Sequence, residues 1–385
     1  MALAGIGIVK DQPIDGSILV LNSGSSSLKF AVYSLDTRVD DPLLAGSASG
    51  IGRTDGKLEV RTAGGTALIH RESIHESQSE ALAAIAAAIR DHIQTKPVIV
   101  GHRVVHGGPK LQAHQVISES VLIELRAAIH FAPLHIPQAI SLIESAQSIF
   151  PSAAQFACFD NIFHHTMPET ASHLPLPQRY FDAGIRRYGF HGISYESIVH
   201  YLGEKLPART IIAHLGNGAS LCALRNGLSI DTTMGLTPTG GIPMGTRSGD
   251  LDPGVLIYLL RNEKLSADGM EELLNHESGL FGLSSGESDV KKLEDLARAG
   301  QPKATLTLDI FTTAVRKAVG AYVALLGGID LLVFTGGIGE HSERIRHSVT
   351  KGLEFLGLTA DHIQIIPTQE EKQIARHCRA ALKLR

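Results

Sequence analysis

The chain has 385 residues, of which 43% are apolar and 19% charged, and its formal net charge is −4. This length exceeds what a single hydrophobic core usually organises, so it predicts two domains of roughly 150–200 residues. Lysines and arginines are scattered rather than gathered in basic clusters. The composition therefore argues against nucleic acid as a partner.

The cysteines and apolar runs place the chain in a broad class. Cys158, Cys222 and Cys378 are far apart and form no CxxC pair, which argues against disulfides or zinc and fits a reducing, cytoplasmic location. No apolar run approaches the roughly 18 residues that span a bilayer, so no membrane partner is expected. The short apolar stretch at the start is not followed by a cleavage site, and residues 1–16 are interpreted as an N-terminal tail.

Three segments in which a strand runs into a glycine turn organise the chain. Residues 17–33 are typical of a β-hairpin with the polar tip NSGSSS, and residues 209–224 repeat this pattern around the turn GNGAS. The third segment, LLVFTGGIGE at residues 331–340, leads into a helix. The first two segments start about half the chain length apart, which predicts two related domains facing each other across a cleft.

Other elements follow from periodicity and from capping signals. Ser77 and Glu80 form a capping-box pattern at the start of an alanine-rich helix. The pattern predicts helices at residues 77–92 and 118–130, strands at 97–105 and 156–160, and a C-terminal helix at 372–385.

Two of the glycine turns have the composition of phosphate-binding loops. NSGSSS (residues 22–27) and HLGNGAS (residues 214–220) offer backbone N–H groups beside small side chains. Lys29 would place an ammonium group near the phosphates. GxGxxG and the P-loop motif are absent, so neither a Rossmann nor a P-loop site is supported. Either turn alone is better explained as a strand connection, but the matching pair favours nucleotide binding.

Two arginines flanked by glycine turns are candidates for binding anions. Arg103 lies in HRVVHGG and Arg247 lies in GTRSGDLDP. A guanidinium group offers a rigid fork of donors that suits a carboxylate or the equatorial oxygens of a transferring phosphoryl group. The alternative for each is an ordinary surface arginine or ion pair.

Carboxylates and histidines complete the candidate set. Asp160, at a strand end, and Glu370 are suited to holding Mg²⁺ or aligning a nucleophile, although Asp160 is equally explained as a helix cap. His135 in APLHIP and His191 in YGFHG are candidate hydrogen-bond donors to a phosphoryl group. The chain has 19 histidines, so composition alone singles out neither.

Taken together, these segments resemble the acetate kinase family (acetate and propionate kinases) of the actin/sugar-kinase/Hsp70 superfamily. The resemblance runs from residue 18 to residue 376. It rests on LVLNSGSSSLKF, HRVVHGG, APLH, FD with FHHTMP, RRYGFHG, HLGNGAS, DTTMGLTP, MGTRSGDLDPG, FTGGIGE and PTQEE, in the family's order and spacing.

The resemblance implies an α/β fold of two actin-like (ribonuclease H-like) domains, each with a mixed five-stranded sheet, flanking a nucleotide cleft. The first domain is expected at residues 17–159 with the C-terminal helix at 372–385 returning to it. The second, nucleotide-binding domain is expected at residues 160–371. A homodimer is also implied.

The resemblance carries roles onto matching positions. Asn22 and Glu370 match the Mg²⁺ positions, for which Mn²⁺ is a substitute, and Arg103 matches the clamp on the substrate carboxylate. The positions matching nucleotide contacts are Lys29, His214, Leu215, Gly216, Asn217, Gly218, Asp289, Val290, Lys291, Gly337, Ile338, Gly339, Glu340 and His341. The catalytic positions are Asp160, His191 and Arg247, and those of an apolar pocket for the methyl group are Val105, Leu134, Phe190 and Pro238.

The implied activity is reversible in-line transfer of the ATP γ-phosphoryl group to acetate, giving acetyl phosphate and ADP. Acetate is ionised at neutral pH, so no general base is needed, and Asp160 is interpreted as an aligner rather than a proton acceptor. The alternatives are a kinase of propionate or another short acid, a kinase with a different phosphoryl donor, and a non-catalytic nucleotide-binding regulator.

Several positions depart from the family pattern. Lys291 and His341 replace an arginine and an asparagine near the expected adenosine site, which leaves the nucleotide preference open. Tyr195 replaces a histidine after FHG, and TGGIP at residues 239–243 replaces a bulkier acidic segment. The second change leaves the length of the acid open, since one methylene is worth only about 1–3 kcal/mol of discrimination.

Overall fold

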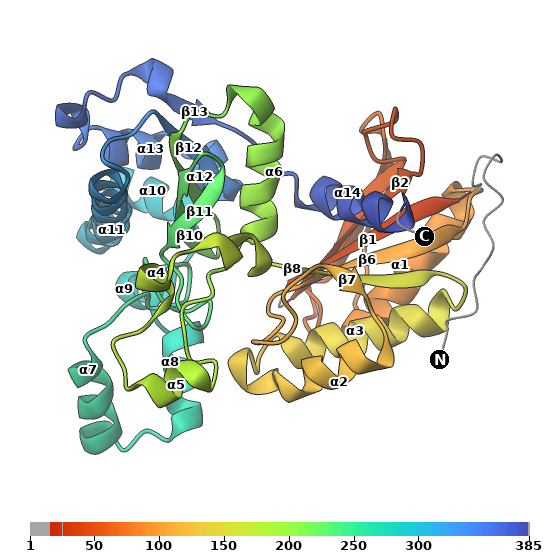
Figure 1. Ribbon diagram of the computed structural model, residues 1–385, viewed down its shortest axis with the longest axis horizontal. Helices are drawn as coiled ribbons and strands as arrows, with labels where there is room; N and C mark the ends of the chain where they lie inside the picture. Colours follow the sequence, from red (N-terminus) through yellow and green to blue (C-terminus); the bar gives the residue numbers. More distant parts are fainter. Residues whose placement is uncertain (1–15, 25, 384–385) are drawn as a thin grey trace.

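The computed structural model describes residues 16–24 and 26–383. Most of the predicted N-terminal tail and the last two residues of the predicted C-terminal helix lie outside the described residues. Two sheets form two lobes, and helices α6 (Gly192–Leu202) and α14 (Glu370–Lys383) lie between them (Figure 1). The chain therefore has the two-lobed α/β architecture that the sequence predicts.

The first sheet has the strand order β5-β4-β3-β2-β1-β6-β8-β7. Its strands are β1 (Ser17–Gly24), β2 (Ser27–Ser34), β3 (Leu44–Ser49), β4 (Lys57–Thr62), β5 (Ala67–Glu72), β6 (Pro97–Val104), β7 (Gln115–Val116) and β8 (Ala154–Phe159). Strands β1 to β5 form an antiparallel meander, while β6 is parallel to both β1 and β8.

The second sheet has the order β11-β10-β9-β12-β13. Its strands are β9 (Arg209–Leu215), β10 (Ala219–Arg225), β11 (Leu228–Thr232), β12 (Leu331–Thr335) and β13 (Ile363–Ile365). Its two antiparallel pairs and two parallel pairs repeat the arrangement of β3-β2-β1-β6-β8 strand for strand. The two predicted hairpins, β1–β2 and β9–β10, therefore occupy equivalent places in the two lobes.

The prediction of five strands in each sheet is wrong for the first lobe. The meander continues beyond β3 because residues 57–62 alternate between buried and exposed side chains, with Leu58 and Val60 in the core. The short strand β7 adds to the other edge, against β8. The predicted helix at 118–130 is also shorter, since α2 (Glu119–Ala127) ends before a 3₁₀ turn at residues 129–131.

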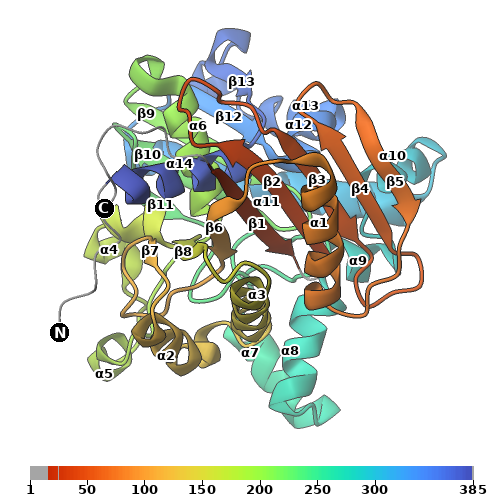
Figure 2. The same cartoon turned by 90° about the vertical axis from the view of Figure 1, so that its right-hand side faces the viewer.

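Alternation along the central strands separates the core into layers. In β1, Leu19 and Leu21 pack with α1 (Gln78–His92) and α3 (Ile136–Ile149), whereas Ile18 and Val20 pack with α14. Figure 2, which looks onto the first lobe, shows α1 lying across its strands.

The second lobe has the same layering. Ile211 and Ala213 of β9 face α11 (Pro302–Leu326), while Ile212 faces α6 together with Tyr195. Helices α6 and α14 thus each cover the inner face of one sheet. The remaining helices are α4 (Glu169–Ser172), α5 (Gln178–Asp182), α7 (Pro253–Tyr258), α8 (Ala267–His276), α9 (Gly279–Ser284), α10 (Val290–Arg298), α12 (Gly336–His341) and α13 (Glu343–Thr350). Among the described residues, no helix combines the length and apolar character needed to cross a membrane.

The chain passes between the lobes twice. The first crossing follows β8, at Asp160, and the second precedes α14, at residues 367–369. The second is tied to α6, because Thr368 Oγ1 donates to Ser194 Oγ at 2.9 Å and the Gln369 N–H donates to Ser197 Oγ at 3.2 Å. Both crossings are therefore ordered structure rather than free linkers.

The contact of α14 with β6 generates a stability prediction. A Cβ atom on Gly101 would lie 2.6 Å from both Ile374 Cγ2 and Cys378 Sγ of α14. Gly101→Ala should therefore force α14 away from the sheet and lower the free energy of unfolding by about 1–3 kcal/mol, measured by urea denaturation. The control is Gly320→Ala in α11, where a Cβ meets no atom within 4 Å. An unchanged midpoint for Gly101→Ala would contradict this packing.

Candidate active site

A cleft of about 390 Å³ opens between the two lobes. Its walls come from the tip of the β1–β2 hairpin, the ends of β6 and β8, the start of α6, the β9–β10 turn and the turn after β12. It is lined by Asn22, Ser23, Gly24, Ser26, Ser27, Lys29, Arg103, Val105, His135, Asp160, Phe190, His191, His214, Gly216, Asn217, Gly218, Pro238, Arg247, Gly336, Gly337, Thr368 and Glu370. Equivalent hairpins from both halves of the chain thus meet at one site.

Asn22 and Glu370 stand together at the first-lobe side of the cleft. Asn22 Nδ2 donates to Glu370 Oε2 and to Glu371 Oε1, both at 2.8 Å. Burial alone would raise the pKa of Glu370, but the positive charge of Arg103 and the contacts with His214 and Asn22 lower it overall. Glu370 is therefore a carboxylate at neutral pH. An ionised carboxylate beside an amide oxygen is the kind of donor set that Mg²⁺ takes.

Arg103 and Asp160 form an ion pair at the ends of adjacent strands. Arg103 Nε donates to Asp160 Oδ2 at 2.8 Å, and Arg103 Nη2 makes a shorter contact with the same oxygen. Burial raises the pKa of Asp160, and the Arg103 guanidinium opposes that shift. Arginine does not deprotonate in proteins, so a charged Asp160 is the state that pairs with it.

This pairing leaves donor capacity of Arg103 facing the cleft. Arg103 Nη1 makes only long contacts, 3.3 Å to Asn22 Oδ1 and 3.5 Å to the Ser23 carbonyl. Asp160 Oδ1 is buried without a side-chain hydrogen bond among the described residues, and the backbone N–H of Ile193 helps to lower the pKa of this carboxyl.

His191 caps the start of α6 in a left-handed backbone conformation, with φ of 60°. Its Nδ1 lies 2.8 Å from Ser220 Oγ, and its ring stacks on His214 with 4.3 Å between the ring centroids. Burial, together with His214 and the two arginines of the cleft, holds the pKa of His191 well below its usual range. His191 is therefore a neutral imidazole whose hydrogen-bonding character depends on its tautomer.

Arg247 faces the cleft without an anionic partner. Its Nη1 donates to the Pro238 carbonyl at 3.0 Å, and it forms no ion pair with any residue that the structure describes. Burial and the charge of Arg103 lower the pKa of Arg247. A half-buried arginine without a carboxylate is costly unless an anion binds there.

The glycine turns bring backbone close to these charged groups. A Cβ atom on Gly218 would lie 3.2 Å from His191 Nε2 and 3.5 Å from Arg247 Nη1, so a side chain there would fill the space beside both. Gly336 has φ of 77°, and a Cβ on it would come within 2.7 Å of the Leu215 carbonyl. Position 336 therefore needs glycine, and glycine at position 218 leaves room beside His191 and Arg247, as expected where backbone approaches a phosphate.

Comparison with known proteins agrees with this site. A sequence profile of the acetokinase family matches residues 17–383. The chain belongs to this family. Acetate kinase from Treponema denticola is 39% identical over 95% of this chain and 100% of the relative.

Two solved structures show the same fold. Acetate kinase from Porphyromonas gingivalis aligns with a TM-score of 0.84 at 34% identity, covering 95% of this chain and 100% of that one. A propionate kinase from Francisella tularensis subsp. tularensis SCHU S4 aligns with a TM-score of 0.86 at 36% identity, covering 94% and 98%. Acetokinase family members are phosphotransferases with a carboxyl group as acceptor, and the two-lobed actin-like fold that the sequence predicts is confirmed.

Some positions predicted from the family resemblance do not line the cleft. These are Leu134, Leu215, Asp289, Val290, Lys291, Ile338, Gly339, Glu340 and His341. Leu215 is fully buried in the second-lobe core, and Leu134 lines a separate neighbouring pocket. The Asp289 side chain caps α10, and the Glu340 carboxylate accepts hydrogen bonds from the Gly336 and Thr368 N–H groups. Nucleotide contact at residues 289–291 and 338–341 stays a prediction.

Other lining residues were not assigned a site role individually. Ser23, Gly24, Ser26 and Ser27 belong to the NSGSSS tip, which the sequence marks as a phosphate loop only as a whole. His135 is one of the two histidines that the sequence indicates as candidate hydrogen-bond donors to a phosphoryl group. Gly336 belongs to the third glycine turn. No sequence pattern marks Thr368 as a site residue, because it reaches the cleft only through the tertiary path of the second crossing between the lobes.

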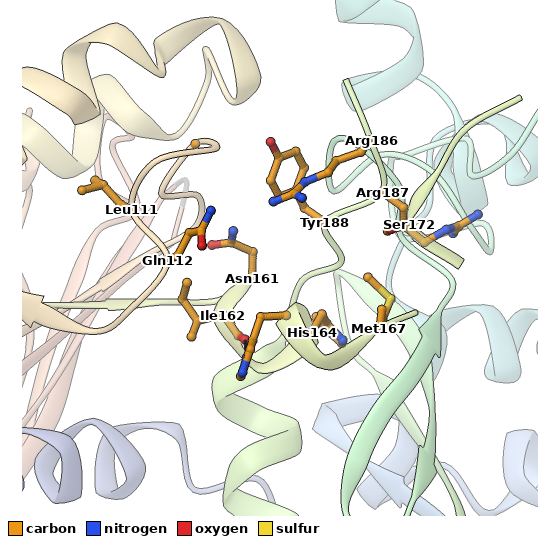
Figure 3. Close-up of a pocket in the computed structure, with 12 residues that line it drawn as sticks. Leu111, Gln112, Asn161, Ile162, His164, Met167, Ser172, Arg186, Arg187 and Tyr188 are labelled. Carbon is orange, nitrogen blue, oxygen red and sulfur yellow. Dashed lines mark hydrogen bonds between the residues drawn. The ribbon is translucent and has the colours of Figure 1, made fainter. Parts of the chain in front are cut away.

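A second, smaller pocket of about 200 Å³ lies beside the first crossing and contains none of the predicted site residues (Figure 3). Several of its polar side chains are already used. His164 bridges Ser229 Oγ and the Phe190 carbonyl, and Arg187 donates to the carbonyls of Thr232 and Thr233. These hydrogen bonds hold the segment that leads into His191. The pocket therefore lies beside residues that position the active site, rather than in the active site itself.

Three buried histidines generate a pH prediction. Burial lowers the pKa values of His102, His106 and His164 to about 4. Between pH 6.5 and 4 the unfolded chain takes up protons at these positions that the native state excludes. Stability should therefore be complete above pH 6.5 and fall as pH drops, by up to about 1.4 kcal/mol per pH unit for each histidine.

The measurement is urea unfolding between pH 7 and 4.5, comparing the parent chain with His102→Asn. The variant should be less stable at pH 7 but should show a shallower loss on acidification. An identical pH slope in the two proteins would contradict the buried neutral state of His102.

Proposed function

We propose that this chain is an acetate kinase that reversibly transfers the γ-phosphoryl group of ATP to acetate, giving acetyl phosphate and ADP by direct in-line transfer. The observation that carries the proposal is the presence of two guanidinium groups, Arg103 and Arg247, in one cleft, where Arg103 is paired with Asp160 and Arg247 has no carboxylate partner among the described residues. Such a cleft is suited to holding two anions side by side. The names of the family relatives support the same reaction.

The two anions differ in what they need. Acetate arrives ionised, so the site has to orient its carboxylate rather than remove a proton. The Nη1 edge of Arg103, which makes only long contacts, is available to that carboxylate. Arg247 and the neutral His191 line the same cleft, and in this proposal they stabilise the charge that develops on the moving phosphoryl group. A single arginine in this role is worth about 10³-fold or more in rate.

Asp160 acts as an aligner in this proposal. It orients Arg103 through Oδ2, and its Oδ1 accepts a hydrogen bond from substrate or from cation-bound water. The charged ion pair disfavours proton transfer to Asp160.

We assign the divalent metal and the phosphates of the nucleotide to other residues that line the same cleft. Asn22 and Glu370 fit Mg²⁺, with Mn²⁺ as a substitute, and such an ion would offset charge on the phosphate oxygens. Lys29 and the turns at residues 214–218 and 336–337 line the phosphate side of the cleft. The adenosine is proposed to extend toward residues 289–291 and 338–341. The proposed domains are residues 17–159 with 372–385, and residues 160–371.

Propionate is the second candidate acceptor. Val105, Phe190 and Pro238 form an apolar wall of the cleft, but Leu134 does not close it. Leu134 lies instead in the adjoining pocket, which shares His135 and Pro238 with the cleft. A longer acid therefore has a direction in which to extend, and a propionate kinase is among the structural relatives.

A cytoplasmic homodimer is the proposed state of the protein. Apolar side chains on and beside α7 are exposed, and α7 lies at the outer end of the second lobe (Figure 1). They are Leu251, Val255, Ile257, Tyr258 and Leu260. Several exposed apolar side chains close together in one short segment are typical of a protein interface.

The reaction is tested by acyl-hydroxamate formation with Mg-ATP and acetate, propionate or butyrate. We expect turnover of acetate, with Arg103→Ala raising KM for the acid and Arg247→Ala lowering kcat by about 10³-fold. Asp160→Asn should also lower kcat, because it weakens the alignment of Arg103. Arg298→Ala, an exposed arginine paired with Asp295 on α10, is the matched control. If none of the acids gives product while ATP still binds, a non-catalytic regulator becomes the better description.

The proposed dimer is tested by sedimentation velocity. Ile257→Asp should convert the dimer to a monomer, because a charge would be buried in the interface. Ile123→Asp, the same change at an exposed isoleucine of α2, should leave the dimer intact. A parent protein that sediments as a monomer would rule out this interface.

A further inference from the structure

Behind His191 lies a short chain of buried hydroxyl groups. His191 Nδ1 is 2.8 Å from Ser220 Oγ, and Ser220 Oγ is in turn hydrogen-bonded to Tyr195 Oη. Ser220 and Tyr195 are both fully buried. Ser220 lies on β10 beside the GNG turn, and Tyr195 lies on the first turn of α6, four residues after His191. These hydrogen bonds therefore join α6 to β10, and both of these elements border the cleft.

The other ring nitrogen of His191 points the opposite way. A Cβ atom on Gly218 would lie 3.2 Å from His191 Nε2, and Gly218 lines the cleft. Whether Nε2 carries a hydrogen determines whether His191 presents a hydrogen-bond donor or an acceptor to the cleft. An N–H there donates to a phosphoryl oxygen, whereas a lone pair there repels it.

Counting the hydroxyl hydrogens determines the tautomer. Among the described residues, Tyr195 Oη has one hydrogen-bond partner, Ser220 Oγ. A buried hydroxyl that donates to nothing is costly, so Tyr195 donates and Ser220 accepts. The hydrogen of Ser220 then has one remaining acceptor, His191 Nδ1. The reverse direction, with His191 Nδ1–H donating to Ser220, leaves the Tyr195 or the Ser220 hydrogen without an acceptor.

From this geometry we infer that Tyr195 and Ser220 are positioning residues, which hold His191 in the tautomer with its hydrogen on Nε2, directed at the cleft. The tautomer follows from the hydrogen-bond chain alone. Its use, donation to the transferring phosphoryl group, rests on the proposed function. The low pKa of His191 agrees, because the ring stays neutral and only its tautomer remains to be set.

The type of residue at position 195 matters for the tautomer. The Tyr195 hydroxyl supplies a single hydrogen with a single direction. A histidine at this place exchanges its own tautomers, so it does not impose a direction by itself. The tyrosine therefore removes one source of tautomer exchange from the site.

The test is Tyr195→Phe, which deletes the hydroxyl and keeps the ring. In ¹⁵N-histidine spectra, the His191 signals are assigned by their loss in His191→Gln. The parent should show hydrogen on Nε2 only, and Tyr195→Phe should show a mixture of both tautomers. Hydroxamate assays should give a kcat reduced about tenfold or more, up to the roughly 10²–10³-fold that complete loss of one donor to a transition state costs, with KM values little changed.

Two further variants keep the test decisive. Ser220→Ala should also give mixed tautomers, and Ser220→Thr, which keeps the hydroxyl, should retain the parent spectrum and rate. The second therefore separates loss of the hydroxyl from a general disturbance, also where Tyr195→Phe does not fold. Tyr322→Phe, another buried tyrosine, lies in α11 outside the cleft and is the control for losing a buried hydroxyl.

The possible results distinguish the tautomer of His191 from its role in catalysis. A parent His191 with hydrogen on Nδ1, or an unchanged spectrum in both Tyr195→Phe and Ser220→Ala, would overturn the positioning role. A changed tautomer with unchanged kcat would leave the hydrogen-bond chain standing but remove His191 from the proposed catalysis. A parent without kinase activity would count against the proposed function and leave the spectroscopic result to decide the tautomer.

Discussion

The cleft depends on an excess of positive charge at a place with limited water. Arg103 and Arg247 approach each other there, and one carboxylate, Asp160, pairs with one of them. An imbalance of this kind is unfavourable in the free protein, since a half-buried charge without a partner loses hydration. It becomes favourable when anions enter. Burial is the main reason that the pKa of His191 is low, and His214 and both arginines lower it further by disfavouring another positive charge.

The fold makes this charge arrangement possible by repeating one unit. Each lobe presents the turn of its first hairpin to the cleft, and each covers the inner face of its sheet with a single helix, α14 or α6. Backbone N–H groups at the turns supply partial positive charge without side chains. Glycine at position 218 leaves the space beside Arg247 and His191 open.

Much of this was predictable from local patterns. The hairpins, the strand ends at Arg103 and Asp160, and the glycine turns follow from alternation, turn chemistry and spacing, and the structure brings those residues to one cleft. The additional strands of the first sheet are not predictable in the same way, because each is short and shows only a few alternating apolar and polar residues. The link from Tyr195 through Ser220 to His191 was also not predictable, since it joins a helix to a strand through contacts that depend on the tertiary fold.

The two places where the chain passes between the lobes have a mechanical consequence. Asp160 lies at one passage, and Glu370 directly follows the other. When two rigid bodies turn about a common axis, the points nearest that axis travel least. If the lobes turned about an axis through these two passages, the two carboxylates would move least and groups farther from the axis would move more. The geometry around the cation would then be preserved at every stage of such a rotation, and the reach of the outer groups would vary with its angle.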